Sequence, residues 1–120
     1  MALAGMASGL LGAVACRQGP PPPVANVPLA DLAGGRRVIV QVGPAPVEVR
    51  QVGDAVQARY LVCTHMACRV SLDEQTGGYR CACHDGHYDA EGRPSAGPPS
   101  LPLADAPFEI EDGAVVFRRA

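Results

Sequence analysis

Short apolar runs, several of them rich in β-branched residues, recur along the chain between turns. Residues 37–42 are dominated by valine and isoleucine, and residues 47–52 alternate apolar and polar positions. Residues 56–62 form a third run, which ends next to a cysteine. Short runs with a period of two are typical of β-strands. Shorter runs with strand character follow at residues 70–72, 79–81, 108–111 and 114–118.

The turns between these runs favour antiparallel pairing. Residues 31–35, 43–46 and 73–78 have turn composition, and residues 112–113 (DG) are a two-residue signal for a tight hairpin. The sequence shows no internal repeat and no convincing amphipathic helix. We therefore expect an all-β domain with the architecture of an antiparallel β-sandwich or barrel. Residues 63–100 are expected to form a subdomain of it.

The composition limits the size of the core and the kinds of partner. The chain has 120 residues, enough for one domain, with three tyrosines, two phenylalanines and no tryptophan. Glycine and proline number 14 and 12, which agrees with short strands joined by loops. A net charge of −2 without a basic run argues against a nucleic-acid partner. A domain of this size has a modest core, so covalent or metal cross-links would help to stabilise it.

The N-terminal segment has the character of an export signal. Residues 1–15 are uncharged and apolar, a run too short to span a bilayer as a helix. The run has the length of a signal-peptide apolar region, and residues 13–15 (AVA) have the small-x-small form of a cleavage site. Cys16 follows directly and is the candidate for lipidation in a lipoprotein. The alternative is an ordinary free cysteine in the remnant of a membrane helix or in a disordered tail. We expect export to the periplasmic face of the bacterial cytoplasmic membrane, with residues 1–16 or their lipid as the anchor.

A proline-rich linker separates this segment from the domain. Residues 17–26 contain four consecutive prolines, residues 20–23, which form a stiff and extended spacer. We therefore place the folded domain at residues 27–120.

Two short segments rich in cysteine and histidine carry the candidate chemistry. The first is residues 63–68 (CTHMAC) and the second is residues 81–84 (CACH), and together they hold four of the five cysteines. The hairpin expected between them brings the two segments side by side. Cys-x-His followed by Cys-x-x-His, with fifteen residues between His65 and Cys81, is the ligand spacing of a Rieske [2Fe–2S] cluster. In that cluster two histidines replace two cysteines on one iron.

Together the two segments closely resemble those of the disulfide-containing Rieske proteins of cytochrome bc-type complexes and of arsenite oxidase. The resemblance covers roughly residues 28–118, and it implies a Rieske-like fold in which residues 63–100 bind the cluster. One [2Fe–2S] cluster per chain is the cofactor that it implies. The ligands that it implies are Cys63 and Cys81 on one iron and His65 and His84 on the other.

The resemblance also implies a disulfide between Cys68 and Cys83, which would tie the two segments together. A disulfide that closes a loop of about fifteen residues contributes about 3 kcal/mol to stability, less any strain. Structural disulfides persist in oxidising compartments, which agrees with the export signal.

Further groups around the cluster follow from the resemblance. The sequence Gly97-Pro98-Pro99 matches the proline loop that covers the cluster from a third side. Tyr88 matches the tyrosine whose hydroxyl donates a hydrogen bond to the sulfur of a cysteine ligand. Gly86 stands where the quinol-oxidising members usually have a serine, so a hydroxyl donor to the cluster is missing.

Two other interpretations of the cysteines use fewer of the residues. A structural zinc site leaves His65 and Cys83 without a role, and a framework of disulfides alone does not need the paired histidines. The ligands of that zinc site would be Cys63, Cys68, Cys81 and His84. His87 is expected to be a solvent-facing loop residue rather than a ligand in any of these interpretations.

The expected activity is the transfer of one electron. Two neutral imidazoles leave the oxidised cluster uncharged, which raises its reduction potential to about −150 to +300 mV, against about −400 mV for plant-type clusters.

The expected physiological role is that of the iron–sulfur subunit of a bc-type quinol–cytochrome oxidoreductase. Its partners would be a cytochrome or another redox protein, or else a quinol together with a cytochrome b subunit. Such a redox subunit has no separate active site of its own. The alternatives are the small relay subunit of a periplasmic oxidase similar to arsenite oxidase, and a free-standing carrier. A Rieske oxygenase component is disfavoured, because such clusters usually lack the additional cysteine pair.

Overall fold

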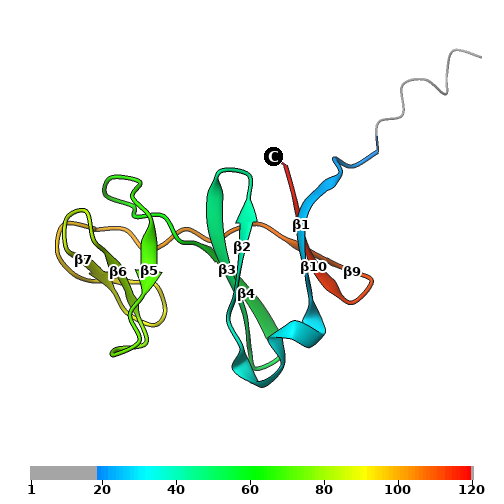
Figure 1. The fold of residues 1–120 in the computed structure, drawn as a ribbon, viewed down its shortest axis with the longest axis horizontal. Coiled ribbons are helices and arrows are strands. Elements are labelled where there is room, and N and C mark those ends of the chain that lie inside the picture. The colour runs from blue at the N-terminus through cyan, green and yellow to red at the C-terminus, as the bar shows by residue number, and fades with distance from the viewer. Residues whose placement is uncertain (1–18, 120) are drawn as a thin grey trace, which may run out of the picture.

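Three antiparallel sheets lie in a row in the computed structural model, which describes residues 19–119 (Figure 1). The central sheet consists of β2 (Val38–Val42), β3 (Ala45–Val52) and β4 (Ala55–Tyr60). At one end lie β1 (Pro23–Pro28), β10 (Ala114–Arg118) and β9 (Glu109–Glu111). At the other end lie β5 (Val70–Leu72), β6 (Tyr79–Cys81), β7 (Gly86–Tyr88) and β8 (Pro94–Ala96). A 3-10 helix, η1 (Leu29–Gly35), joins β1 to β2, so the all-β class is confirmed.

The strands expected from the apolar pattern are present, and three further strands were missed. Strands β7 and β8 are three residues long, too short to show a period of two. Strand β1 has proline at both ends, which concealed it within the expected linker. It lies at the edge of its sheet, where proline is tolerated because one side of the backbone has no strand partner. The first strand of the described residues therefore begins at Pro23, ahead of the domain start expected at residue 27, and η1 lies where a turn was expected at residues 31–35.

The sheet that contains β1 and the central sheet share one apolar core. Side chains from both sheets and from η1 interdigitate there, as in a two-layered sandwich. The period of two in β3 is visible in this core, because Val47 and Val49 are both fully buried. The buried members of the core are Val27, Leu32, Val47, Val49, Ala58, Ala106, Val115 and Phe117.

The sheet β5-β6-β7-β8 has a core of its own, and two candidate ligands belong to it. The chain enters this subdomain from β4 and returns to pair with β4 again, because the Tyr60 N–H donates to the Ala104 carbonyl over 2.9 Å. The subdomain is therefore an insertion between β4 and β9. Its buried members are Leu61, Cys63, Val70, Tyr79, Cys81, Tyr88 and Leu103.

Strand β3 is covered on both of its faces. The alternation in residues 47–52 is that of a strand with one face in water, yet Glu48 is only 2% exposed. Its carboxylate accepts a hydrogen bond from Tyr79 of β6. The inserted subdomain therefore covers part of the face opposite Val47 and Val49.

The expectations for the N-terminus concern residues that the structure does not describe. The cleavage site and Cys16 both lie outside residues 19–119. Within residues 19–119, no helix combines the length and the hydropathy needed to cross a membrane.

Candidate metal centre

The first cysteine–histidine segment is a tight loop directly after β4. The Cys63 N–H donates to the Cys68 carbonyl over 2.7 Å, and the Ala67 N–H donates to the Cys63 carbonyl over 2.9 Å. These two bonds close the loop on itself. Ala67 has a φ of 57°, a left-handed conformation that strains a residue with a side chain. The loop thus presents His65 at its tip between two cysteines.

The second segment is the turn of the β6–β7 hairpin. Cys81 ends β6 and pairs with Gly86, the first residue of β7. Asp85, next to His84, closes the turn with a φ of 52°. The sequence did not predict β7, so it did not show that the second segment would be a hairpin turn.

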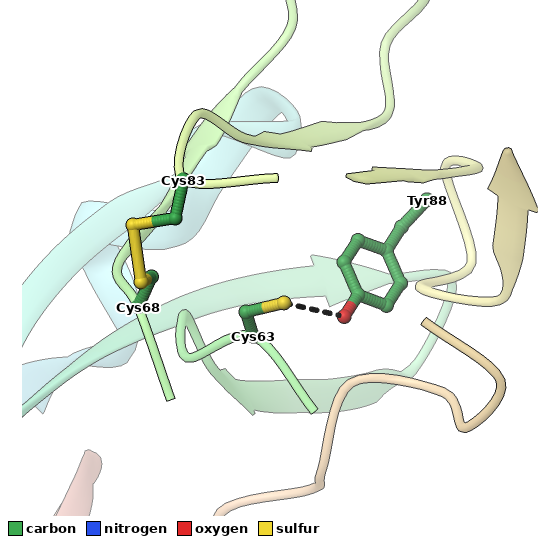
Figure 2. Close-up of a disulfide and its surroundings, with 4 residues drawn as sticks. All are labelled: Cys63, Cys68, Cys83 and Tyr88. Atoms are coloured by element: carbon green, nitrogen blue, oxygen red, sulfur yellow. Dashed lines mark hydrogen bonds between the residues drawn. A yellow bond between two sulfur atoms is a disulfide. The ribbon is translucent and has the colours of Figure 1, made fainter. Parts of the chain in front are cut away.

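The two segments are brought together by a covalent bond and by their histidines. Cys68 and Cys83 form the disulfide that the sequence predicted, with their Cα atoms 6.4 Å apart (Figure 2). The rings of His65 and His84 meet edge to face, with centroids 5.0 Å apart. Residues far apart in the sequence therefore place two imidazoles side by side.

The four expected ligands differ sharply in their exposure to solvent. Cys63 and Cys81 are free thiols and are 3% and 0% exposed. His65 and His84 are both exposed. The expected ligands therefore have a buried sulfur side and an exposed imidazole side, an arrangement that fits thiolates on one iron and imidazoles on the other.

The Cys63 thiol is held in surroundings that favour its thiolate form. Burial by itself raises the pKa of Cys63, but hydrogen bonds from Tyr88 and from the backbone of His65 and Met66 outweigh burial. The contact with Cys81 acts in the same direction, and the pKa falls below its ordinary value of 9.0. A thiolate is the form that binds metal ions, so this environment suits a ligand.

Tyr88 contacts the sulfur of an expected ligand, as the resemblance implied, and the sulfur is that of Cys63. The hydroxyl also has a partner that the sequence did not reveal. The Tyr88 hydroxyl donates to Cys63 Sγ over 3.5 Å (Figure 2). It accepts a hydrogen bond from the Thr64 N–H over 3.1 Å, and the Thr64 hydroxyl lies 3.0 Å from it. The Thr64 hydroxyl also donates to the Leu101 carbonyl over 2.7 Å. Thr64 therefore ties the first loop to Tyr88 and to the segment after the proline loop.

The expected proline loop lies against the second segment. A side chain at Gly97 would come within 2.5 Å of the Asp85 carbonyl, and Gly97 has a φ of 82°. A Cβ at Gly86 would lie 2.8 Å from Pro99 Cγ. Pro99 is buried, whereas Pro98 is exposed. The ring of Pro99 therefore occupies the space that a side chain at residue 86 would need.

The disulfide bears on the alternative metal site. The sulfur atoms of Cys68, Cys81 and Cys83 lie within 4.8 Å of one another, which is an arrangement that could hold a metal ion. Two of these three sulfurs are bonded to each other, so they cannot act as thiolate ligands. Their proximity instead places the disulfide beside Cys81, and the same bond removes Cys68 from the ligands of the alternative zinc site.

The remaining histidine contacts the surface ion pair between Arg80 and Asp85. His87 Nε2 lies 3.2 Å from an oxygen of Asp85, and Arg80 Nη2 lies 3.3 Å from the same oxygen. This charged group lies on the surface of the β6–β7 hairpin.

The sequence of this chain is similar to that of known iron–sulfur subunits. The chain is 35% identical over 89 residues to the cytochrome b6-f complex iron–sulfur subunit of Chlorobaculum tepidum. The matched region covers 74% of this chain and 49% of that protein. The chain thus spans about half the length of this curated relative.

Two solved structures have a similar fold. The cyanobacterial plasma membrane Rieske protein PetC3 from Synechocystis PCC 6803 has a TM-score of 0.59 at 26% identity, covering 80% of this chain and 99% of that one. A ferredoxin of Sphingomonas yanoikuyae B1 has a TM-score of 0.56 at 26% identity, covering 82% and 100%. Residues 23–107 match the family described as Rieske [2Fe-2S] domain, and the chain therefore belongs to that family.

Proposed function

We propose that this protein is a one-electron carrier that holds a Rieske [2Fe–2S] cluster in the inserted subdomain. Cys63 and Cys81 would bind one iron, and His65 and His84 would bind the other. The observation that carries the proposal is that two loops joined by a disulfide each supply one buried free thiol and one exposed imidazole, with the two imidazole rings in contact. All six cysteines and histidines of the two segments then have a role.

The residues of the site suit this cofactor in charge as well as in position. When bound, the cluster takes up and releases one electron. Two thiolates and two neutral imidazoles balance the charge of two ferric ions and two sulfides. The Tyr88 hydroxyl donates to one thiolate and stabilises its negative charge. The exposed imidazoles would each keep one ring nitrogen free to meet a redox partner.

For the physiological role, we favour the iron–sulfur subunit of a quinol–cytochrome oxidoreductase of bc type. Support comes from the relative that is a cytochrome b6-f complex iron–sulfur subunit. The partners would be a cytochrome, and a quinol bound with a cytochrome b subunit. Export, with anchoring through residues 1–16 and lipidation of Cys16, belongs to the same proposal.

One observation favours a second role, that of a relay subunit of a periplasmic oxidase or a free-standing carrier. Gly86 supplies no hydroxyl to the cluster, and Pro99 fills the space where a serine would lie. Loss of a hydrogen bond to the cluster lowers its potential, which suits a donor other than ubiquinol. Copurification with a cytochrome b subunit from the native membrane would support the first role, and its absence the second.

The cofactor is tested by metal and sulfide analysis of the purified protein. We expect two iron atoms and two acid-labile sulfides per chain, and the loss of both from the His84→Ala variant. The His87→Ala variant is the matched control, because His87 contacts Asp85 and is not expected to bind iron. One zinc ion per chain without sulfide would refute the proposal.

A further inference from the structure

The contact between the central sheet and the inserted subdomain is buried yet polar. Glu48 of β3 is 2% exposed and Tyr79 of β6 is 1% exposed. The Tyr79 hydroxyl donates to Glu48 Oε1 over 2.5 Å. Burial and the neighbouring Glu48 carboxylate raise the pKa of Tyr79, so the hydroxyl keeps the proton that it donates. One short hydrogen bond therefore connects the two parts of the molecule at their interface.

Arginines surround this hydrogen bond and compensate the buried carboxylate. Arg37 Nη1 lies 3.3 Å from Glu48 Oε2, and the Arg37 guanidinium lies 5.9 Å from the centre of the Tyr79 ring. Arg59 Nη1 donates to the Tyr79 hydroxyl over 3.3 Å. A buried carboxylate is tolerated only when it is paired and hydrogen-bonded in this way.

The same arginines hold the backbone of the inserted subdomain. Arg37 donates to the Gly77 carbonyl over 3.3 Å, in the turn before β6. Arg59 and Arg50 both donate to the Ala90 carbonyl, over 3.0 and 2.9 Å, just after β7. The guanidinium group can make several such bonds at once in a fixed plane. The turn before β6 and the segment just after β7 are thus bound to arginine side chains of the central sheet and of the residue that precedes β2.

The position of β6 and β7 determines the contact between Tyr88 and Cys63. Tyr79 and Tyr88 are directly opposite each other in the β6–β7 pair, so their side chains lie on the same face. The side chain of Cys63 is buried in the core of the inserted subdomain, but its loop follows β4 closely, and the Leu61 N–H still donates to a carbonyl of β3 over 2.9 Å. The hydrogen bond from Tyr88 to Cys63 therefore joins the β6–β7 hairpin to a loop that is also attached to the central sheet.

We propose that the hydrogen bond from Tyr79 to Glu48 positions the β6–β7 hairpin so that Tyr88 reaches the sulfur of Cys63. The inference rests on the proposed function, because that sulfur is the expected iron ligand. Glu48 and Tyr79 are then positioning residues that act on the reduction potential through Tyr88. The contact is directional, which an apolar contact between the same elements would not be.

Reduction potentials measured by voltammetry on the holoprotein test this inference in a double-mutant cycle. The Tyr79→Phe variant removes one hydroxyl without a change of charge, and we expect it to lower the potential by less than Tyr88→Phe does. In the Tyr88→Phe background we expect Tyr79→Phe to have no effect on the potential. An equal shift in both backgrounds, or no shift in either, would overturn the inference.

A conservative variant separates positioning from a direct effect of charge. In Glu48→Gln the amide oxygen can still accept from Tyr79, so we expect a potential within error of the wild type. A rise in potential would show that the carboxylate acts through its negative charge, and would overturn the inference. This variant also serves as the test if Tyr79→Phe does not fold.

The matched control is Tyr60, the remaining tyrosine of the chain. Within residues 19–119 the Tyr60 hydroxyl has no hydrogen-bond partner, so Tyr60→Phe should leave the potential unchanged. Absorption spectra and iron analysis must show an intact cluster in every variant. A wild-type protein without the cluster would refute the proposed function, whereas an intact cluster with additive shifts would refute only the positioning role.

Discussion

At the scale of single residues, the hydroxyl of Tyr88 has one proton and two acceptors within reach. Cys63 Sγ lies 3.5 Å away and the Thr64 hydroxyl oxygen lies 3.0 Å away. The Thr64 hydroxyl donates to the Leu101 carbonyl over a shorter distance of 2.7 Å. The Tyr88 proton is thus available to the sulfur, and a negatively charged sulfur attracts it most strongly.

The Tyr88→Phe variant should therefore have a lower reduction potential than the wild type. A hydrogen bond to a charged group is worth about 1.5–3 kcal/mol, and only its difference between the two redox states affects the potential. That difference is on the order of 1 kcal/mol, or about 40 mV for one electron, given about 59 mV for each tenfold change. Voltammetry on a variant with an unchanged iron content is the measurement. A potential equal to that of the wild type would contradict the role assigned to this hydroxyl.

Gly86 illustrates how a neighbour restricts a substitution that looks harmless in the sequence. The left-handed residue of this turn is Asp85, so strain in φ does not explain the glycine. The reason is Pro99, whose Cγ would lie 2.8 Å from a Cβ at residue 86. Serine at this position adds a hydrogen-bond donor only if the proline loop moves away.

We therefore expect Gly86→Ser to destabilise the protein, although it would supply the hydroxyl that the sequence lacks. Overpacking of this kind typically costs about 1–3 kcal/mol. Chemical denaturation should show this loss, and Pro99→Ala in the same chain should recover part of it. Gly19→Ser is the control, because a Cβ at Gly19 would meet no atom within 4 Å. Wild-type stability in Gly86→Ser would mean that the proline loop is free to shift.

At the scale of elements, the disulfide joins a loop that belongs to β4 with a turn that belongs to the β6–β7 hairpin. Cys68 and Cys83 are 15 positions apart in the sequence, and β5, its turn and β6 lie between them. These elements are short strands with few buried side chains of their own. The covalent link therefore restricts the two segments in the unfolded chain and keeps them together in the folded one.

Removal of the disulfide should loosen the site as well as the fold. In a variant with Cys68→Ala and Cys83→Ala, we expect the free energy of unfolding to fall by about 3 kcal/mol, the value for a loop of about this length. We also expect faster loss of iron in the presence of a chelator. Denaturation curves and iron release give the two readouts. If thiol reagents label both cysteines in the untreated native protein, the disulfide is absent and the prediction fails.

At the scale of the whole molecule, two apolar cores meet at a polar interface. The first core lies between the sheet with β1 and the central sheet, and the second lies inside the inserted subdomain. Between them lie Glu48, Arg59 and Tyr79, all nearly inaccessible to solvent. The two parts are therefore held together by directional bonds, which depend on protonation.

The stability of the protein should consequently fall in alkaline solution. Burial and Glu48 raise the pKa of Tyr79, and burial and Cys63 raise that of Tyr88, from the ordinary value of 10.0. Above pH 10.0 the unfolded chain loses these protons while the folded chain retains them, so ionisation favours unfolding. Each group then contributes a slope of up to about 1.4 kcal/mol per pH unit. The measurement is urea denaturation between about pH 8 and about pH 11, where tyrosines ionise. The free energy of unfolding should fall less steeply with pH in Tyr79→Phe than in the wild type. An identical slope for that variant and the wild type would exclude Tyr79 as a cause.

The local pattern of the sequence indicated most of the strands and the candidate ligands. Alternation and turn residues indicated most of the strands, because both depend on neighbours along the chain. The spacing of the cysteines and histidines indicated a Rieske centre, and the resemblance assigned the disulfide that the structure contains. Strand β1 was missed because its strand character comes from pairing with β10, at the far end of the chain.

Only the tertiary structure decided which polar residues are buried and which small ones are needed. Alternation places Glu48 on the face opposite Val47 and Val49, but a period of two records that one face is apolar and not whether the other face is covered. Its burial depends on Tyr79, thirty-one positions further along the chain. The need for glycine at residue 86 likewise depends on Pro99. Contacts between distant segments have no periodic signature in either segment, and for that reason the sequence indicated the ligands while the fold decided what holds them in place.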